Sequence, residues 1–300
     1  MGYIIFSKSI EEEIDLQSEI YTFPLGKFTC TIIQDDGATQ TADDIFKDIN
    51  PEERDPIIAK SRYNPQAMDL SFNVLLIQTP TQRILVDTGN GVETGGGGRL
   101  LAHLDELKIS PASVDIVILT HAHSDHYAAM LTQSGEKIFP NARYVMWQDE
   151  WEFYSSADRL EFEKNRSQAR YDFMQIYFLP LHDKLTFITP ENPQVTEGIS
   201  LIYAPGHSKH HVAVKIESDG QGLLYAGDAF IHPLHAENPN WKFYVEVDPD
   251  IAITSKNRIL EMVIQQKMLL MGYHFPFPGV GRMCRDAEGI YRWAPQTISS

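Results

Sequence analysis

The sequence predicts an α+β protein in which two β-sheets pack face to face and helices cover their outer sides. Three observations lead to this prediction. Strand-like segments fall into two groups along the chain, each group is followed by helical segments, and the 43% of hydrophobic residues are enough for a substantial core. A chain of 300 residues has room for one large domain or for two small ones.

The first group of strands precedes residue 148. Short apolar and β-branched runs predict strands at 27–33, 70–79, 83–88, 115–119 and 143–147. Apolar residues at helical spacing predict helices at 41–60, at 100–107, at a turn that begins with Pro111, and from Tyr127 onward. Segment 148–176 is rich in charged and aromatic residues and is expected to be helical, either as a packing helix or as a lid over a pocket.

The second group of strands is expected at 184–188, 199–204, 212–216 and 222–225. A long helix is then predicted from Asp250 to Met271, because Asp248-Pro249 is a start signal and Gly272 a stop signal. The glycine-rich segment that begins at Gly89 has Thr94 where a dinucleotide-binding fingerprint needs its third glycine, so a flexible loop is expected there.

The charge of the chain argues against some classes of partner. It has 41 acidic and 25 basic residues, and a formal net charge of -16 repels nucleic-acid phosphates and, more weakly, anionic membranes. Cys30 and Cys284 are far apart in sequence and are expected to be two buried free thiols. No segment resembles a signal peptide or a membrane span, so we expect a soluble cytoplasmic protein that acts on a small molecule.

The densest group of chemically active side chains is residues 120–126, Thr-His-Ala-His-Ser-Asp-His. It starts where the predicted strand 115–119 ends. Side chains two residues apart on extended backbone point to the same side, so His121 and His123 can bind one metal ion together. Asp125 and His126 follow after the backbone has turned and can face a second ion beside the first.

Three more candidate ligands stand at the ends of later segments, namely His207, Asp228 and His274. Five histidines and two aspartates are about what two adjacent zinc ions need when water fills the remaining positions. The simplest partition gives His121, His123 and His207 to the first ion, Asp125, His126 and His274 to the second, and Asp228 to both. Two zinc ions are expected, with manganese, iron or cobalt as alternatives.

A binuclear centre of this kind has the chemistry of a hydrolase. Metal binding lowers the pKa of water from 15.7 to about 7, so the centre holds a bridging hydroxide at neutral pH. This hydroxide can attack an ester, lactone, amide or phosphoester. Asp125 is the predicted catalytic residue, because it can carry a proton to the leaving group while it binds metal.

Other residues near these motifs are expected to support the centre. The aromatic side chains of Trp147, Trp151, Phe230 and Phe275 are predicted to wall the substrate pocket. Among the remaining histidines, His211 and His232 are expected to orient metal ligands, while His210 and His235 lie in the same half of the sequence. His103 and His182 are expected to be surface or packing residues.

The motifs resemble those of the metallo-β-lactamase superfamily. The resemblance covers about Leu70 to Gly281 and rests on Val86-Asp87-Thr88-Gly89, Thr120 to His126, Pro205-Gly206-His207, Gly227-Asp228 and His274. It implies that residues 1–300 form a single domain, an αβ/βα four-layer sandwich, with a binuclear metal site between the sheets held by the same seven residues.

The segment 271–281, together with His232, is similar to the branch of that superfamily that contains methyl-parathion-hydrolase-like and lactonase-like enzymes. Members of that branch are dizinc enzymes, often homodimers, that act on lactones, esters or organophosphate triesters. The resemblance therefore implies a homodimer, in which residues 1–35 would be an N-terminal extension used in dimerisation.

The sequence also departs from the pattern of the family. Ala128-Ala129 replaces Gly-Gly after the first motif, and His210 replaces a glycine after His207. Ile231 stands where acyl-homoserine-lactone lactonases carry a tyrosine that helps to polarise the substrate carbonyl, and it is expected in the pocket wall. This difference argues against a role in quorum quenching.

Several other functions fit the same ligand set. A thioester hydrolase like glyoxalase II and a β-lactamase are alternatives within hydrolysis. A diiron redox or oxygen-binding protein is an alternative from another class, although the sequence contains no flavin domain to serve as its redox partner. A metal-stabilised scaffold without catalysis is the remaining alternative.

Overall fold

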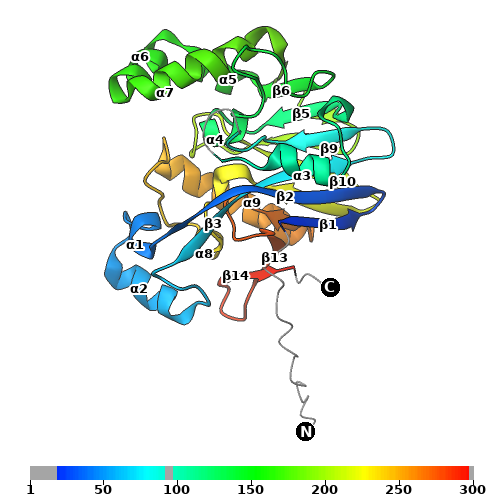
Figure 1. Ribbon diagram of the computed structural model, residues 1–300. Helices are drawn as coiled ribbons and strands as arrows, with labels where there is room; N and C mark the ends of the chain where they lie inside the picture. Colours follow the sequence, from blue (N-terminus) through cyan, green and yellow to red (C-terminus); the bar gives the residue numbers. More distant parts are fainter. Residues whose placement is uncertain (1–18, 92–96, 297–300) are drawn as a thin grey trace.

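The computed structural model describes residues 19–91 and 97–296, and in these ranges two sheets of seven strands each pack against one another (Figure 1). Helices lie on the outer side of each sheet, so the layers are helix, sheet, sheet and helix. The predicted α+β class and the four-layer αβ/βα sandwich are confirmed.

The first sheet follows the order of the chain from β1 to β7. The strands are β1 (Ile20–Leu25), β2 (Phe28–Gln40), β3 (Met68–Gln78), β4 (Arg83–Val86), β5 (Ile116–Leu119), β6 (Arg143–Trp147) and β7 (Leu185–Ile188). Pairing is antiparallel from β1 to β4 and parallel from β4 to β7. Since parallel strands bury both faces, β5 is apolar at every position, as the sequence of a buried strand requires.

The second sheet also follows the order of the chain. The strands are β8 (Gln194–Thr196), β9 (Ile199–Tyr203), β10 (Val212–Ser218), β11 (Gln221–Tyr225), β12 (Leu269–Met271), β13 (Val280–Arg285) and β14 (Tyr291–Pro295). Its pairs are antiparallel except β11 with β12, which are parallel because α9 connects them in a crossover.

The helices connect these strands and cover the two sheets. They are α1 (Ala42–Ile45), α2 (Pro51–Lys60), α3 (Leu100–Glu106), α4 (Ser124–Tyr127), α5 (Gln148–Ser155), α6 (Ala157–Arg166), α7 (Gln168–Phe173), α8 (Pro233–Glu237) and α9 (Pro249–Gln265). Shorter helical turns lie at Pro111–Ser113, Met174–Phe178, Leu179–Lys184 and Gly227–Ala229. Figure 1 shows α5, α6 and α7 together at one end of the molecule, near β6.

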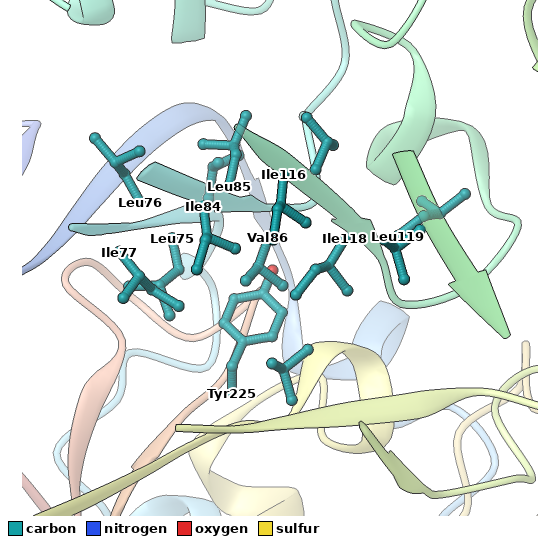
Figure 2. Packing of buried hydrophobic residues seen from close by; sticks show 14 of the residues in the cluster. Leu75, Leu76, Ile77, Ile84, Leu85, Val86, Ile116, Ile118, Leu119 and Tyr225 are labelled. Atoms are coloured by element: carbon teal, nitrogen blue, oxygen red, sulfur yellow. The ribbon is translucent and has the colours of Figure 1, made fainter. Parts of the chain in front are cut away.

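The central core lies between the two sheets and continues under the helices of the first sheet. Figure 2 shows apolar side chains of β3, β4 and β5 packed together, with the ring of Tyr225 from β11 reaching them from the second sheet. A second core packs α9 against the other face of the second sheet, with Ile259 and Leu260 fully buried. A third joins α1, α2 and α8 around Phe46.

Three predicted elements differ from the structure. The helix predicted from Asp250 to Met271 ends at Gln265, and its last residues form β12. Lys267 has a φ of 53°, which interrupts the helix, and the Leu-Leu-Met run then pairs with β11. The helix predicted from Tyr127 onward is a single turn that begins at Ser124. The strand predicted at 184–188 belongs to the first sheet, because it pairs in parallel with β6.

The N-terminal region, the glycine-rich segment and the cysteines have separate outcomes. Residues 19–35 form β1 and the start of β2, while residues 1–18 lie outside the described residues, so the role of 1–35 in dimerisation stays a prediction. Of the predicted flexible loop, residues 92–96 also lie outside. Its start is packed, because the buried Asp35 carboxylate accepts a hydrogen bond from the backbone of Asn90. Cys30 is buried as expected, but Cys284 is exposed.

In the described part of the chain, no helix is both long enough and apolar enough to cross a membrane.

Candidate metal centre

The motif at residues 120–126 has the backbone that its spacing predicts. Strand β5 ends at Leu119, and His123 has the extended backbone of a helix N-cap, with φ of -90° and ψ of 147°. The short helix α4 then begins at Ser124 and contains Asp125 and His126. The extended part and the helical part of one motif therefore present their side chains to two neighbouring positions.

A first ligand group consists of His121, His123, His207 and Asp228, whose donor atoms all lie within 4.8 Å of one another. The Nδ1 atom of His123 lies 3.0 Å from Nε2 of His121 and 3.0 Å from Nε2 of His207. Donors about 2.1 Å from a tetrahedral zinc ion are about 3.4 Å apart. The group thus has nearly the dimensions of one zinc coordination shell.

A second ligand group consists of Asp125, His126 and His274, again within 4.8 Å. Oδ2 of Asp125 lies 3.6 Å from Nε2 of His126 and 3.4 Å from Nε2 of His274. Asp228 connects the two groups, since its carboxylate lies 3.4 Å from His126, 3.3 Å from His274 and 3.2 Å from His207. The structure brings together all seven residues predicted as ligands.

The donor atoms of this centre fit divalent cations. Nε2 of His126 and Oδ1 of Asp228 are buried and have no hydrogen-bond partner among the described residues. Buried polar atoms without partners are costly, and cations bound between them would satisfy both. Imidazole nitrogens and carboxylate oxygens are donors that zinc accepts. The two ligand groups together can therefore hold two ions.

The ring nitrogens on the outer side of the centre have partners that fix the orientation of the rings. Nδ1 of His126 lies 2.8 Å from the carboxylate of Asp87, and Nδ1 of His274 lies 3.2 Å from the carbonyl oxygen of Ser71. Nε2 of His123 lies 3.3 Å from the hydroxyl of Tyr154. In each ring the remaining nitrogen points at the other ligands.

Asp87 supports several parts of the centre, although the sequence analysis gave it no role of its own. Its carboxylate is fully buried and accepts hydrogen bonds from the backbone and side chain of Thr120 and from the hydroxyl of Tyr225. It also contacts His126. Its φ of 59° is unusual for an aspartate and turns the side chain back toward β5. The Asp-Thr-Gly that directly follows β4 was the sequence signal that could have identified this supporting role.

Glu150 is a second supporting residue that the sequence analysis missed. It lies in α5, is fully buried, and accepts hydrogen bonds from the backbone of Ala122 at 3.1 Å and of His210 at 2.8 Å. It thereby joins the loop of the first motif to the loop that follows His207. Burial raises the pKa of its carboxyl group. Nothing in the local sequence distinguishes it from other helical glutamates.

Charge is distributed unevenly between the ligand groups. Burial, followed by the neighbouring histidines, lowers the pKa of His121 and of His123, which keeps both imidazoles neutral as metal binding requires. Burial alone would also lower the pKa of His274, but contacts with Asp228 and Asp125 raise it to about 9. The first group therefore offers neutral imidazoles to a metal ion, whereas His274 must release a proton when the second group binds one.

Comparisons with known proteins agree with this geometry. The chain matches the metallo-beta-lactamase superfamily over residues 69–267, which is more than half of its length. The chain belongs to the metallo-β-lactamase superfamily. The motifs quoted for the resemblance lie within the matched region, apart from His274, which follows it.

Individual relatives within the superfamily are distant. A beta-lactamase-like protein 2 homolog of Drosophila melanogaster is 28% identical over 56% of this chain and 50% of its own length, so the chain spans about half of that curated relative. An N-acyl homoserine lactonase of Bacillus thuringiensis is 25% identical over 66% of this chain and 79% of its own. The lactonase-like branch suggested by the sequence is supported.

One solved structure shows how closely the fold agrees. It is AidC, a dizinc quorum-quenching lactonase in complex with a product, N-hexanoyl-L-homoserine. It is 24% identical, and the alignment covers 95% of this chain and 100% of that chain with a TM-score of 0.82. At this identity the likeness supports the superfamily fold over nearly the whole described chain.

In this protein, two cavities border the candidate metal centre. A cavity of about 650 Å³ is lined by His123, Ser124 and Asp125 on one side and by residues of α6, α7 and the segment 244–247 on the other. A smaller one of about 220 Å³ extends from His123 toward Phe173 and Met174. Either can give a substrate access to Asp125 or His123. Segment 148–176, which forms α5 to α7, thus packs beside the pocket.

The side chains predicted as pocket walls lie away from these two cavities, so their part in a substrate pocket stays a prediction. None of the five residues Trp147, Trp151, Phe230, Ile231 and Phe275 lines either one, and each is at most 6% exposed. All five are packed in the cores, and Phe230, Ile231 and Phe275, which closely follow ligands in sequence, fill the interior behind them.

The remaining histidines separate into three kinds. Nε2 of His211 accepts a hydrogen bond from the backbone of Asp228 at 3.1 Å, in agreement with the orienting role predicted for it. His232 instead contacts the rings of Phe46 and Tyr63, and within residues 19–91 and 97–296 it makes no contact with the ligand groups. His103 pairs with Glu19, and the side chain of His182 is 63% exposed.

Proposed function

We propose that the chain is a binuclear metal-dependent hydrolase of a small ester or lactone, with organophosphate triesters as a further substrate class. The position of Asp228 supports this most directly, because one carboxylate contacts both ligand groups at 3.2 to 3.4 Å. The lactonase relatives support the same type of reaction. Zinc is the proposed metal, since the nitrogen and oxygen donors suit it, with manganese, iron and cobalt as alternatives.

Two divalent ions held in the ligand groups would supply a hydroxide at neutral pH and would polarise the carbonyl or phosphoryl group. Hydrolysis adds water across the C–O or P–O bond, so that the hydroxyl goes to the acyl or phosphoryl centre and a proton goes to the leaving oxygen. The chain must therefore deliver a proton at the side where the leaving group departs.

Asp125 is the residue that we propose for this proton transfer. Its side chain is 24% exposed and lines the larger cavity, whereas Asp228 is 3% exposed. Contacts with His126 and His274 outweigh the effect of burial and lower the pKa of Asp125. It is therefore ionised at neutral pH, so it can accept the proton that a water molecule gives up on becoming hydroxide and pass that proton on to the leaving oxygen.

We do not extend the proposal to N-acyl homoserine lactones. The sequence carries Ile231 where lactonases of that specificity are expected to have a polarising tyrosine. Ile231 is buried in the core around Phe46, so its side chain does not reach a substrate. A homoserine lactone should consequently be a poorer substrate than an aryl ester or a simple γ-lactone, as competition assays would measure.

The experiment for this function uses purified protein reconstituted with zinc. We expect hydrolysis of at least one of 4-nitrophenyl acetate, γ-nonalactone and paraoxon, loss of turnover on chelation, and its return on adding zinc. Inactivity on all three with two ions bound per chain would contradict the proposal. Turnover confined to S-lactoylglutathione or nitrocefin would assign one of the alternative hydrolases, and absorbance from bound iron would favour a redox protein.

The quaternary state and the exclusion of nucleic acids are also proposals. We propose a homodimer, which light scattering coupled to size exclusion tests directly. The net charge of -16 supports a small-molecule substrate over a polynucleotide. Salt-dependent binding of RNA or DNA would contradict this.

A further inference from the structure

The larger cavity beside the metal centre contains an unusual concentration of positive charge. Three arginines, Arg159, Arg166 and Arg170, line it opposite His123 and Asp125. The whole chain has only 25 basic residues and a formal net charge of -16. We propose that these arginines bind a carboxylate of the substrate, so that the hydrolysed ester or lactone carries an anionic group apart from its scissile bond. This inference rests on the proposed hydrolase function.

The sequence of α6 explains why these side chains share one cavity. Arg159, Phe162 and Arg166 are three and seven residues apart, which places them on one face of a helix. Arg170 follows in α7, and α6 and α7 pack against each other (Figure 1), while Arg170 lines the same cavity. One helical face therefore brings two guanidinium groups and one aromatic ring to the same surface.

Two of the arginines are held in place by a buried carboxylate. Glu163 is 2% exposed and forms ion pairs with Arg159 and with Arg170, the latter at 3.6 Å. The guanidinium of Arg159 also lies 4.7 Å from the ring centroid of Tyr154. The two ion pairs fix the positions of Arg159 and Arg170. Because one glutamate carries a single negative charge, the three side chains together keep a net positive charge.

Arg166 is the arginine that remains available. Within residues 19–91 and 97–296, no ion pair or side-chain hydrogen bond involves it. The acidic side chains in the cavity do not compensate it, because Glu246 is paired with the buried Lys256 at 2.8 Å and Asp125 belongs to the second ligand group. The cavity therefore offers at least one free guanidinium to an anion.

The chemistry of this surface suits a carboxylate at the end of an apolar chain. Arginine binds carboxylates with two parallel hydrogen bonds. Phe162, Tyr244 and Val247, which are 51%, 43% and 40% exposed, line the same cavity. They can cover the apolar part between the scissile bond at Asp125 and the anionic end at Arg166.

The test compares a neutral ester with esters that carry a carboxylate at increasing distance from the scissile bond. The zinc-loaded protein is assayed with 4-nitrophenyl pentanoate and with the 4-nitrophenyl half-esters of succinate, glutarate, adipate and suberate. We expect kcat/KM for at least one half-ester to exceed that for the neutral ester, with the difference mostly in KM. Raising the salt concentration should reduce this preference, because exposed ion pairs are screened.

Variants then assign the preference to the cavity. In Arg166→Met the ratio of kcat/KM for the preferred half-ester to that for the pentanoate should fall about tenfold or more, and Arg166→Lys should restore part of it. The matched control is Arg62→Met. It removes an exposed arginine near α2 that does not line the cavity, so the ratio should stay as in the wild type.

The outcomes separate this inference from the proposed function. No hydrolysis of any of these esters, of γ-nonalactone or of paraoxon, with two ions bound per chain, would contradict the proposed function itself. Hydrolysis of the pentanoate without preference for any half-ester, or a preference that Arg166→Met leaves intact, would overturn the inference and leave the hydrolase proposal standing. A preference for the corresponding phosphate-terminated esters over every half-ester would also overturn the assignment of a carboxylate.

Discussion

Two groups of buried histidines in this protein have opposite surroundings. His121 and His126 are 0% exposed and face one another and the carboxylates of Asp87 and Asp228. His232 and His235 are 0% and 1% exposed, but they face aromatic rings, with 4.9 Å between the ring centroids of His235 and Phe46. The two groups have the same residue type and the same burial.

The difference shows that burial alone does not make a histidine a ligand. In the first group several donor atoms converge, and a cation can satisfy them together. In the second group no carboxylate contacts either ring among the described residues, so each imidazole stays neutral within an apolar core. Changes to residues of the two groups should therefore have different kinds of effect.

The largest effect is expected for His123→Ala. The first ligand group loses the nitrogen that lies 3.0 Å from both His121 and His207, so the variant should lose at least one metal ion and more than about a hundredfold in kcat/KM. Metal analysis and ester hydrolysis measure both losses. The control variant is His182→Ala, because His182 is exposed and lies outside both ligand groups, and it should keep its metal and activity. Full activity of His123→Ala would refute the ligand assignment.

The next largest effect is expected for Asp125→Asn. The amide keeps the shape of the carboxylate but cannot carry a proton, so kcat should fall by about a hundredfold while the unfolding temperature stays near that of the wild type. A leaving group of low pKa, such as 4-nitrophenol, should suffer less than an alkyl alcohol. Equal losses for both leaving groups would exclude the proton transfer.

The aromatic group should affect stability instead of activity. Burial lowers the pKa of His232 to about 3, whereas an exposed histidine has a pKa of 6.5. Between these two pH values the unfolded chain binds a proton at this residue and the folded chain does not. The contribution of His232 to the free energy of unfolding should therefore be fully present above pH 6.5. It should decrease by about 1.4 kcal/mol per pH unit as the pH falls below that value. Urea unfolding from pH 7 to pH 4.5 measures the slope.

The matched variant for that slope is His232→Asn. An asparagine keeps an acceptor for the backbone of Leu234, which now donates to Nδ1 of His232 at 3.2 Å, but it does not titrate. The dependence on pH should be shallower in the variant. An unchanged slope would show that other groups cause the acid sensitivity.

The smallest effect is expected for His235→Leu. Both ring nitrogens of His235 are buried without a hydrogen-bond partner among the described residues, so an apolar side chain of similar size removes a cost and loses no bond. Stability should change by less than about 1 kcal/mol or increase. A loss of metal or of activity in this variant would contradict the contrast between the two groups.

The ligand groups could be predicted from the sequence because their spacing is local. His121 and His123 follow an apolar strand, and Asp125 follows a turn, so that the direction of each side chain depends on a few backbone torsions. His207 and Asp228 likewise stand in the turns that follow β9 and β11. The order and packing of strands then bring these ends together.

The supporting and lining residues could not be predicted in the same way. Glu150 acts through backbone groups of Ala122 and His210, which only the folded chain brings to it. Phe230 and Phe275 adjoin motif residues in sequence but point into the core behind the centre. The apolar run 269–271 is compatible with either a helix or a strand. Its pairing with β11, which the sequence does not show, makes it a strand.

The location of bound metal tests the central claim most directly. Crystals of the zinc-loaded protein, measured on both sides of the zinc absorption edge, should show two anomalous peaks per chain, one in each ligand group, with the carboxylate of Asp228 between them. A single peak, or peaks away from these two groups, would contradict the binuclear centre.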